Sequence, residues 1–315
     1  MVLIDNQWQR NYQNPIGRWA GVGPYYAMFP NEFAFDVVHR FTNPGDRVLD
    51  PFAGRFSSIY ASTTQGRDGT GIEINPVGWV YGQAKLHPAA QDDVKARLKE
   101  ICRRSRWFGI RSQRKLPEFF SYCYSEKVLA FLLAAKSELN WRNDRVDTTL
   151  MSLILVALHA KLGSGLSNQM RQSKAMAPDY SVKWWQDNGL EIPPTIDPLS
   201  FMLKKIDWRY QHGVPTDIGS GEALLADSTV KLADLKLEIE NDGKAKFKLL
   251  LTSPPYYDIT HYHYDQWLRL WMLGNPPWPS KTEDKHRGRF SGSLAKWLSY
   301  NMGQGHLGHL IGQRS

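Results

Sequence analysis

The chain has 315 residues, of which 42% are hydrophobic, so a sizeable core is expected and general disorder is disfavoured. Its net charge of +8 gives only weak support for a polyanionic partner. Two cysteines, Cys102 and Cys123, are too few for a disulfide framework and fit a reducing cytoplasm. The start has no apolar signal region, and the longest apolar run, Leu150–Ala160, is too short to span a bilayer, so it is predicted to form a buried helix.

Two strand–turn–helix units are predicted near the start of the chain. Arg47–Phe52 has the apolar character of a buried strand, Ala53-Gly54 forms its turn, and a helix is expected from Ser57. Gly69–Ile74 is predicted to be a second strand, and the next helix is expected to begin at Asn75-Pro76. This βαβ order indicates a parallel sheet with helices on its faces.

The pattern changes after these units. Residues 91–215 are predicted to be mainly helical, with apolar periodicity in Glu126–Leu139 and Asp147–Leu162. Strand character returns in Glu222–Asp227 and in Phe247–Thr252. The sequence therefore predicts four strands, two on each side of a long helical segment.

The predicted fold class is α/β, with one sheet domain interrupted by a mainly helical insert. The sheet domain comprises residues 1–90 and 216–290, the insert comprises residues 91–215, and residues 291–315 are expected to form an irregular tail. The insert holds 20 Lys and Arg against 13 Asp and Glu, a net charge of +7 (20 − 13). Either the insert binds a polyanion, or it is a helical layer whose outer face is rich in Lys and Arg.

Two polar motifs follow the first two predicted strands. Asp50-Pro51-Phe52-Ala53-Gly54 lies at a strand end, where ligands of open α/β sheets bind and where a glycine lets the backbone approach a ligand. Glu73 ends the second strand, and a carboxylate there can accept both hydroxyls of a ribose. The plain structural alternatives are a common turn and an exposed acid at a strand end.

The sharpest motif is Thr252-Ser253-Pro254-Pro255-Tyr256, which directly follows the last predicted strand. Two successive prolines remove two backbone donors and stiffen the turn, so that the carbonyls become fixed acceptors. Tyr256 offers a flat face for a base. A proline-rich surface turn is the alternative, and the order of the three motifs disfavours it.

Taken together, these motifs resemble those of the amino-methylating DNA methyltransferases, which modify N4 of cytosine or N6 of adenine. The resemblance covers residues 17–90 and 216–275. It implies a Rossmann-like sheet that binds S-adenosyl-L-methionine, and it gives the insert the position of a target-recognition region for double-stranded DNA. The implied catalytic residues are Ser253, Pro254, Pro255 and Tyr256, and the implied cofactor-binding residues are Tyr25, Phe29, Asp50, Pro51, Phe52, Ala53, Gly54, Glu73, Ile74 and Asp227.

The resemblance also implies the chemistry. The Ser253 side chain and the Pro254 carbonyl would accept the hydrogens of an exocyclic amine and free its lone pair, and the base would be flipped out of the stack onto Tyr256. Ser before Pro-Pro resembles the cytosine-N4 enzymes, whereas Asp or Asn resembles the adenine-N6 enzymes. Methylation at carbon 5 of cytosine is disfavoured, because it needs a cysteine nucleophile and neither Cys102 nor Cys123 lies in a Pro-Cys motif.

Three other functions stay open: an adenine-N6 DNA methyltransferase, an RNA base methyltransferase, and an inactive DNA-binding remnant. A cognate restriction endonuclease would be the partner of a sequence-specific DNA enzyme. Only four strands are found where the family has seven, and Ser291–Ser315 contains a single β-branched residue, Ile311. We therefore expect the far half of the sheet to be missing from this chain.

Two segments of the insert are candidate DNA contacts. The first segment, which contains Arg103, Arg104 and Arg106, mixes arginines with aromatic residues. It is expected to contact phosphates, and a solvated helix end is the alternative. The second segment, which contains Asn168, Gln169, Arg171 and Lys174, follows a Gly- and Ser-rich stretch. Its side chains are of the types that read base edges. His261 and His263 have no acidic partner set, so no metal is predicted. The candidate DNA-binding residues are Arg103, Arg104, Arg106, Asn168, Gln169, Arg171 and Lys174.

Overall fold

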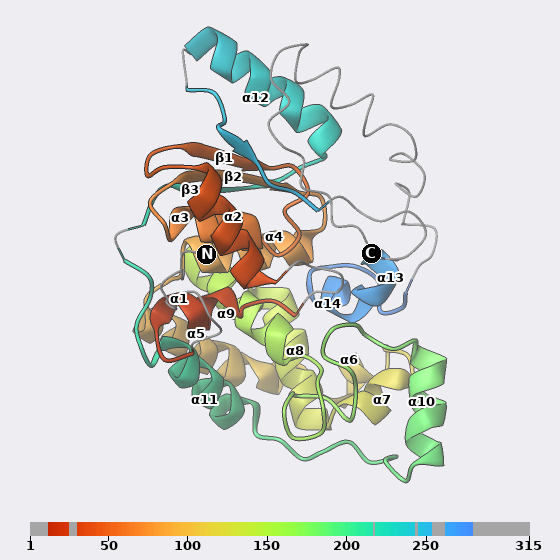
Figure 1. The fold of residues 1–315 in the computed structure, drawn as a ribbon. Coiled ribbons are helices and arrows are strands. Elements are labelled where there is room, and N and C mark those ends of the chain that lie inside the picture. The colour runs from red at the N-terminus through yellow and green to blue at the C-terminus, as the bar shows by residue number, and fades with distance from the viewer. Residues whose placement is uncertain (1–11, 25–29, 217, 243–244, 254–261, 280–315) are drawn as a thin grey trace.

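Four parallel strands form one sheet in the order β3–β2–β1–β4. All four predicted strands are confirmed, and each ends one or two residues earlier than predicted. The reason is clearest at Pro51, which has no N–H to donate to a neighbouring strand. The strands are β1 (Arg47–Asp50), β2 (Asp68–Glu73), β3 (Gly221–Leu225) and β4 (Leu249–Leu250). The computed structural model describes residues 12–24, 30–216, 218–242, 245–253 and 262–279 (Figure 1).

Helices cover both faces of the sheet (Figure 1). On one face, Leu232 and Leu235 of α12 pack against Leu49 and Ile72 of the sheet in a small core cluster. On the opposite face lie α3 and α4, and α2 packs against α3. This is the α/β/α layering that a parallel sheet requires, because both of its faces must be buried. These helices are α2 (Asn31–Phe41), α3 (Ser57–Thr63), α4 (Pro76–Leu86) and α12 (Ser228–Asp242).

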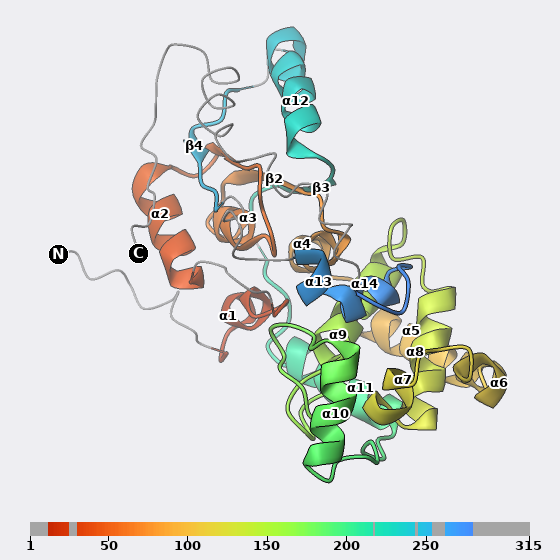
Figure 2. The same ribbon diagram turned by 90° about the vertical axis from the view of Figure 1, so that its right-hand side faces the viewer.

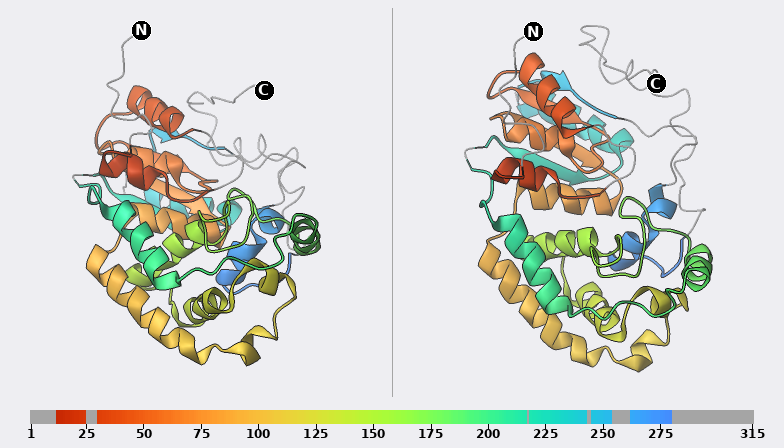
Figure 3. Two further views of the ribbon diagram at one scale, coloured as in Figure 1. Left: turned by 90° about the horizontal axis from the view of Figure 1, so that it is seen from below. Right: turned by 60° about the horizontal axis from the view of Figure 1, so that its bottom comes forward.

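A helical layer lies below α3 and α4, and α1 lies at its side (Figures 1 and 3). Helix α9 packs directly on α4, and the ring of Trp79 meets the ring of Trp141 edge-on, with centroids 6.0 Å apart. A single hydrophobic core runs from the sheet helices through this layer. The layer consists of α5 (Gln91–Arg104), η2 (Ser105–Trp107), α6 (Ile110–Gln113), α7 (Phe119–Cys123), α8 (Glu126–Glu138), α9 (Arg145–Ala157), α10 (Pro178–Asp187) and α11 (Pro198–Tyr210), and α1 spans Pro15–Ala20.

The predicted helix at residues 126–139 corresponds closely to α8. The prediction of a helix as far as Leu162 is wrong at its end, because α9 stops at Ala157. There the chain folds back, and the Ala157 carbonyl accepts the N–H of Leu166 at 2.8 Å. The end of the apolar run, up to Ala160, is buried but not helical.

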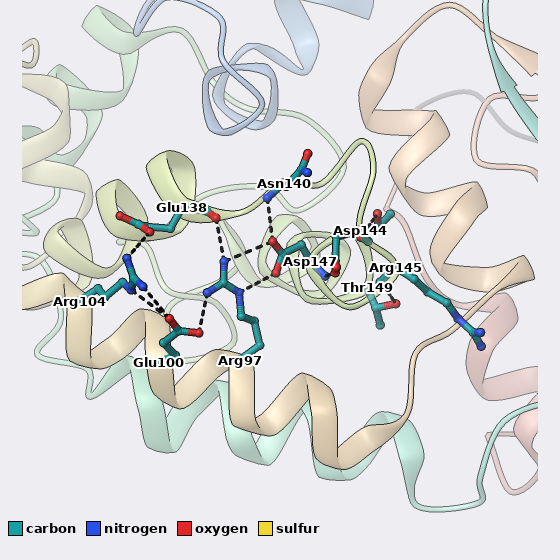
Figure 4. A network of polar contacts seen from close by, with 10 residues as sticks. Arg97, Glu100, Arg104, Glu138, Asn140, Asp144, Arg145, Asp147 and Thr149 are labelled. Carbon is teal, nitrogen blue, oxygen red and sulfur yellow. Dashed lines mark hydrogen bonds and ion pairs between the residues drawn. The ribbon is translucent and has the colours of Figure 1, made fainter.

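A network of ion pairs joins α5 to α8 and α9 (Figure 4). Arg97 contacts Asp147 and Glu100, each at 2.7 Å, and it also donates to the Glu138 carbonyl at 2.8 Å. Arg104 contacts the carboxylates of Glu100 at 2.9 Å and Glu138 at 2.8 Å. The Asp147 side chain is only 7% exposed, so its pairing with Arg97 fixes the outer helices of the layer.

Two short helices follow β4 in the sequence. Helix α14 (Trp267–Met272) packs against α4 and α8, and α13 (Tyr262–Asp265) precedes it. No helix in the described part of the chain is long and apolar enough to cross a membrane. The predicted irregular tail, residues 291–315, lies outside the described residues. The division into a sheet domain and an insert stays a prediction.

Candidate functional site

The carboxyl ends of the four strands meet at one edge of the sheet, on the side that Figure 2 turns to the viewer. The loop Asp50–Gly54 leaves β1, Glu73 ends β2, Asp227 follows β3, and Ser253 follows β4. Backbone pairing places β1 between β2 and β4, so the turn after β1 lies between the other two exits. The fold therefore brings together described residues of all three sequence motifs.

Glu73 holds the turn after β1 in place. Its carboxylate accepts the N–H of Gly54 at 2.7 Å and the N–H of Asn75 at 2.8 Å. Gly54 has a φ of 52°, in the left-handed region that favours glycine. On α4, a Cβ added at Gly78 would lie 2.3 Å from the Gly54 carbonyl oxygen, so helix and turn are in contact through their backbones. The position of Glu73 relative to the turn is thus fixed by its own hydrogen bond to Gly54 and by the contact between α4 and the turn.

Two buried carboxyl groups lie at this edge. Asp50 is 1% exposed, and burial raises its pKa to about 6, although the hydroxyls of Ser58 and Thr252 and the N–H of Phe52 lower it. Burial raises the pKa of Glu73 to about 7; its backbone N–H donors lower it, and the charge of Asp50 adds to the rise. A ligand that donates hydrogen bonds to these carboxyl groups would favour their ionised forms.

The exit of β3 is tied to the same turn. The N–H of Ala226 donates to the Glu73 carbonyl at 3.1 Å, and the Ser228 hydroxyl donates to the Pro51 carbonyl. Asp227 caps α12, because its Oδ1 accepts the backbone N–H of Thr229 at 2.9 Å. Asp227 therefore has a structural role in addition to any contact with a ligand.

The edge also offers apolar surface and a spare donor. The Ile74 side chain is 45% exposed, and Phe52 is half-buried. The Asn75 Nδ2 is buried and has no hydrogen-bond partner among the described residues. A carboxyl group, an unused N–H donor and exposed apolar side chains fit a ligand that has hydroxyls, an acceptor and a flat ring.

The structure identifies Arg55, next to the turn, as a residue that the sequence analysis missed. Its guanidinium donates to the Gly23 carbonyl at 3.2 Å and to Asn31 Oδ1 at 2.7 Å, and its own carbonyl accepts from Lys85. Phe56, one residue later, has a φ of 63°, which costs about 1–3 kcal/mol in a non-glycine residue. The only sequence signal for either residue is its place directly after the Asp50–Gly54 motif.

Several predicted site residues lie outside the described part of the chain. Nothing is therefore assigned to their positions, and their roles stay predictions. They are Tyr25, Phe29, Pro254, Pro255 and Tyr256, together with His261 and the side chain of His263.

The predicted phosphate contacts lie in two different environments. Arg104 belongs to the ion-pair network of Figure 4. Arg103 and Arg106 are exposed, and the Arg106 guanidinium lies 4.8 Å from the ring centroid of Trp107, whose side chain is 72% exposed. No acidic residue occurs between positions 103 and 115. Three further exposed cations follow Arg103 and Arg106 in this stretch. These cations are Arg111, Arg114 and Lys115.

The predicted base-reading segment is largely engaged within the protein. Asn168 is fully buried, and its Nδ2 donates to the carbonyls of Tyr122 at 3.1 Å and Leu190 at 2.6 Å. Gln169 accepts the N–H of Leu162 at 2.7 Å. Arg171 is exposed, and Lys174 lies 3.4 Å from the Asp265 carboxylate. This placement favours a structural role for Asn168 over base reading.

One family match covers the first quarter of the chain. Residues 2–77 match the family of N6/N4 methyltransferases described as DNA methylase. The chain is also 39% identical over 54 residues to the Type II methyltransferase M.XycI of Xanthomonas campestris pv. cyanopsidis. That segment covers 17% of this chain and 18% of the relative. The family match contains the Asp50–Gly54 turn and Glu73.

Proposed function

We propose that this chain, whose residues 2–77 match the N6/N4 DNA methylase family, is an amino-methylating DNA methyltransferase. It would transfer a methyl group to an exocyclic base amine. The target in our proposal is N4 of cytosine in a specific duplex sequence, because Ser253 stands before the two prolines. The observation that carries the proposal is the meeting of the Asp50–Gly54 turn, Glu73 and Ser253 at one edge of the sheet.

The donor in this proposal is S-adenosyl-L-methionine, which supplies a methyl group on a positively charged sulfonium. The described residues fit it. Glu73 would accept the ribose hydroxyls, the unused Nδ2 of Asn75 would donate to an acceptor of the ligand, and Ile74 would pack against the adenine. Gly54 leaves room for close approach, and the half-buried Phe52 of the same turn would line the site.

On the base side, the residues of the third motif would act by position rather than by covalent chemistry. The exocyclic amine is a poor nucleophile because its lone pair is delocalised into the ring. Acceptance of its hydrogens by the Ser253 hydroxyl and the Pro254 carbonyl would localise that lone pair for in-line attack. Tyr256 would stack on the flipped base.

The DNA backbone would be held by an exposed basic group that runs from the end of α5 to just after α6. This group consists of Arg103, Arg106, Arg111, Arg114 and Lys115. This group lies on the same side of the molecule as α13 and α14 (Figure 1). The logarithm of the DNA-binding constant falls linearly with the logarithm of the salt concentration. Loss of one phosphate contact should reduce the size of this slope by about 0.9. The double variant Arg111→Gln/Arg114→Gln should show this change, whereas Lys204→Gln, an exposed cation on α11, should not. If the unmodified protein and both variants show the same salt dependence of DNA binding, the basic group does not contact the DNA.

The function is tested by incubating the protein with tritiated S-adenosyl-L-methionine and either genomic DNA or RNA, followed by nucleoside analysis. We expect labelled 4-methylcytosine in DNA. Labelled 6-methyladenine would move the target to adenine, and label in RNA alone would replace DNA as the substrate. Binding of the cofactor without any transfer would identify an inactive DNA-binding remnant. Protection of the modified DNA from an endonuclease encoded beside the gene would identify a restriction–modification pair.

A further inference from the structure

Residues 172–176 hold the two helices that follow the predicted catalytic motif; we call this segment the bracket. At its first residue, the Gln172 carbonyl accepts Nη2 of Arg269 at 2.6 Å. At its last residue, the Met176 carbonyl accepts the indole N–H of Trp267 at 3.1 Å. Both donors belong to α14 and both are buried, so the two ends of the bracket are fixed to one helix.

The middle of the bracket contacts the end of α13 and the residue after it. The N–H of Ala175 donates to the Asp265 carbonyl at 2.9 Å, and the Lys174 ammonium lies 3.4 Å from the Asp265 carboxylate. The Ser173 carbonyl accepts from Gln266 at 3.4 Å. Five successive residues therefore each contact α13, α14 or the residue between them, a pattern that a freely moving base-reading loop would not show.

Arg269 links the bracket to the helical layer. Its side chain is fully buried, its Nε donates to the Leu155 carbonyl of α9 at 3.1 Å, and its Nη1 donates to Gln266 Oε1 at 2.6 Å. A single guanidinium thus joins α9, the bracket and α14. The cation is satisfied by several polar acceptors that would be left unpaired without it.

We infer that the bracket positions the catalytic motif, with Trp267 and Arg269 as positioning residues for the proposed methyl transfer, on which this inference rests. The motif ends at Tyr256, and α13 begins six residues later at Tyr262. Strand β4 anchors the chain before the motif, and the bracket anchors it after the motif. Because in-line transfer depends on placement to within about 1 Å, loosening one anchor should lower turnover by tenfold or more without changing cofactor affinity.

The matched variants Trp267→Phe and Trp19→Phe test this inference. Trp19 is also buried, and its indole N–H donates to the Gly213 carbonyl at the same 3.1 Å, but it lies in α1, away from the bracket. We expect kcat for DNA methylation to fall about tenfold in Trp267→Phe alone, with the cofactor Kd unchanged in both variants. Equal kcat values in the two variants would contradict the bracket, as would a parallel loss of cofactor affinity in Trp267→Phe.

A second measurement does not depend on methylation. Amide hydrogen exchange of peptides covering residues 253–262 should be faster in Trp267→Phe than in the unmodified protein or in Trp19→Phe. Unchanged exchange would overturn the inference even if the enzyme is active. If the unmodified protein methylates no nucleic acid, the proposed function fails, and the exchange rates still decide whether the bracket restrains this segment.

Discussion

Binding of S-adenosyl-L-methionine should depend on pH through Glu73. This carboxyl group is buried, and burial raises its pKa from the usual 4.5 to about 7. In the proposed site, the ribose hydroxyls donate to the carboxylate, so the cofactor binds the ionised form. Without a ligand, ionisation of the buried group opposes folding, so its contribution to stability falls as the pH rises from 4.5 through about 7. Cofactor affinity should change in the opposite direction and increase over the upper part of this range.

The size of the effect follows from the ionised fraction. With a pKa of about 7, roughly 9% of the carboxyl groups are ionised at pH 6 and roughly 90% at pH 8. Apparent affinity scales with the fraction of protein that is competent to bind, so the Kd should be about tenfold higher at pH 6 than at pH 8. Binding near pH 7 should also release about half a proton per site, since half of the groups must ionise.

Titration calorimetry in two buffers of different ionisation enthalpy measures both quantities. The Glu73→Gln variant is the control. It keeps an acceptor oxygen for the N–H of Gly54 but has no charge to titrate, so its Kd should be weaker and nearly independent of pH. Any pH dependence left in this variant would come from Asp50, whose pKa is raised to about 6, or from the amino group of the cofactor. Equal Kd values at pH 6 and pH 8 in the unmodified protein would show that binding is not coupled to ionisation of Glu73 in this range. An unchanged Kd in Glu73→Gln would refute the assignment of Glu73 as the ribose-binding acid.

Two further predictions concern the packing around the site and the helical layer. Gly78→Ala should lower the unfolding free energy by about 1–3 kcal/mol and weaken cofactor binding, because its Cβ would lie 2.3 Å from the Gly54 carbonyl oxygen. Thermal unfolding and calorimetry measure the two effects, and an unaltered cofactor Kd would contradict the proposed role of this turn. Asp147→Ala should cost about 3 kcal/mol or more in urea unfolding, because it leaves Arg97 without its most buried partner. Glu138→Gln, at a more exposed carboxylate, should cost less than about 1 kcal/mol, and equal losses would show that burial of the pair is not what matters.

The positions of the strands could be predicted from sequence because each is a short apolar run that ends in residues with a special backbone role. Asp50 and Pro51 end β1, and Glu73 ends β2. In a parallel sheet such ends must lie at the same edge, so the proximity of the first two motifs followed from the pattern alone. The strand order could not be predicted, because it depends on which strands pair after the long helical segment returns the chain to the sheet.

The predicted roles in the helical layer were harder to obtain, since burial there is decided by partners far away in the sequence. Asn168 has the residue type of a base reader, yet its carboxamide lies between the backbones of Tyr122 and Leu190. Arg104 looks equivalent to Arg103 in sequence, and only the folded positions of α5 and α8 pair it with acidic residues. Local sequence carries residue type, but it does not carry the distant acceptor that decides how the side chain is used.

The shared core also determines how recognition and chemistry can be separated by experiment. Trp79 of α4 contributes to the sheet layer and meets Trp141 of the helical layer, and the Tyr210 hydroxyl of α11 donates to the Ala89 carbonyl just after α4 at 2.7 Å. Removal of residues 91–215 would expose this face of α4, so loss of DNA binding in such a deletion would not locate the DNA contacts. Substitutions of the exposed cations Arg111 and Arg114, in and just after α6, leave the core intact and are the sharper test. The same continuity underlies the inferred positioning role of the bracket, because residues 172–176 join α13 and α14 to the helical layer.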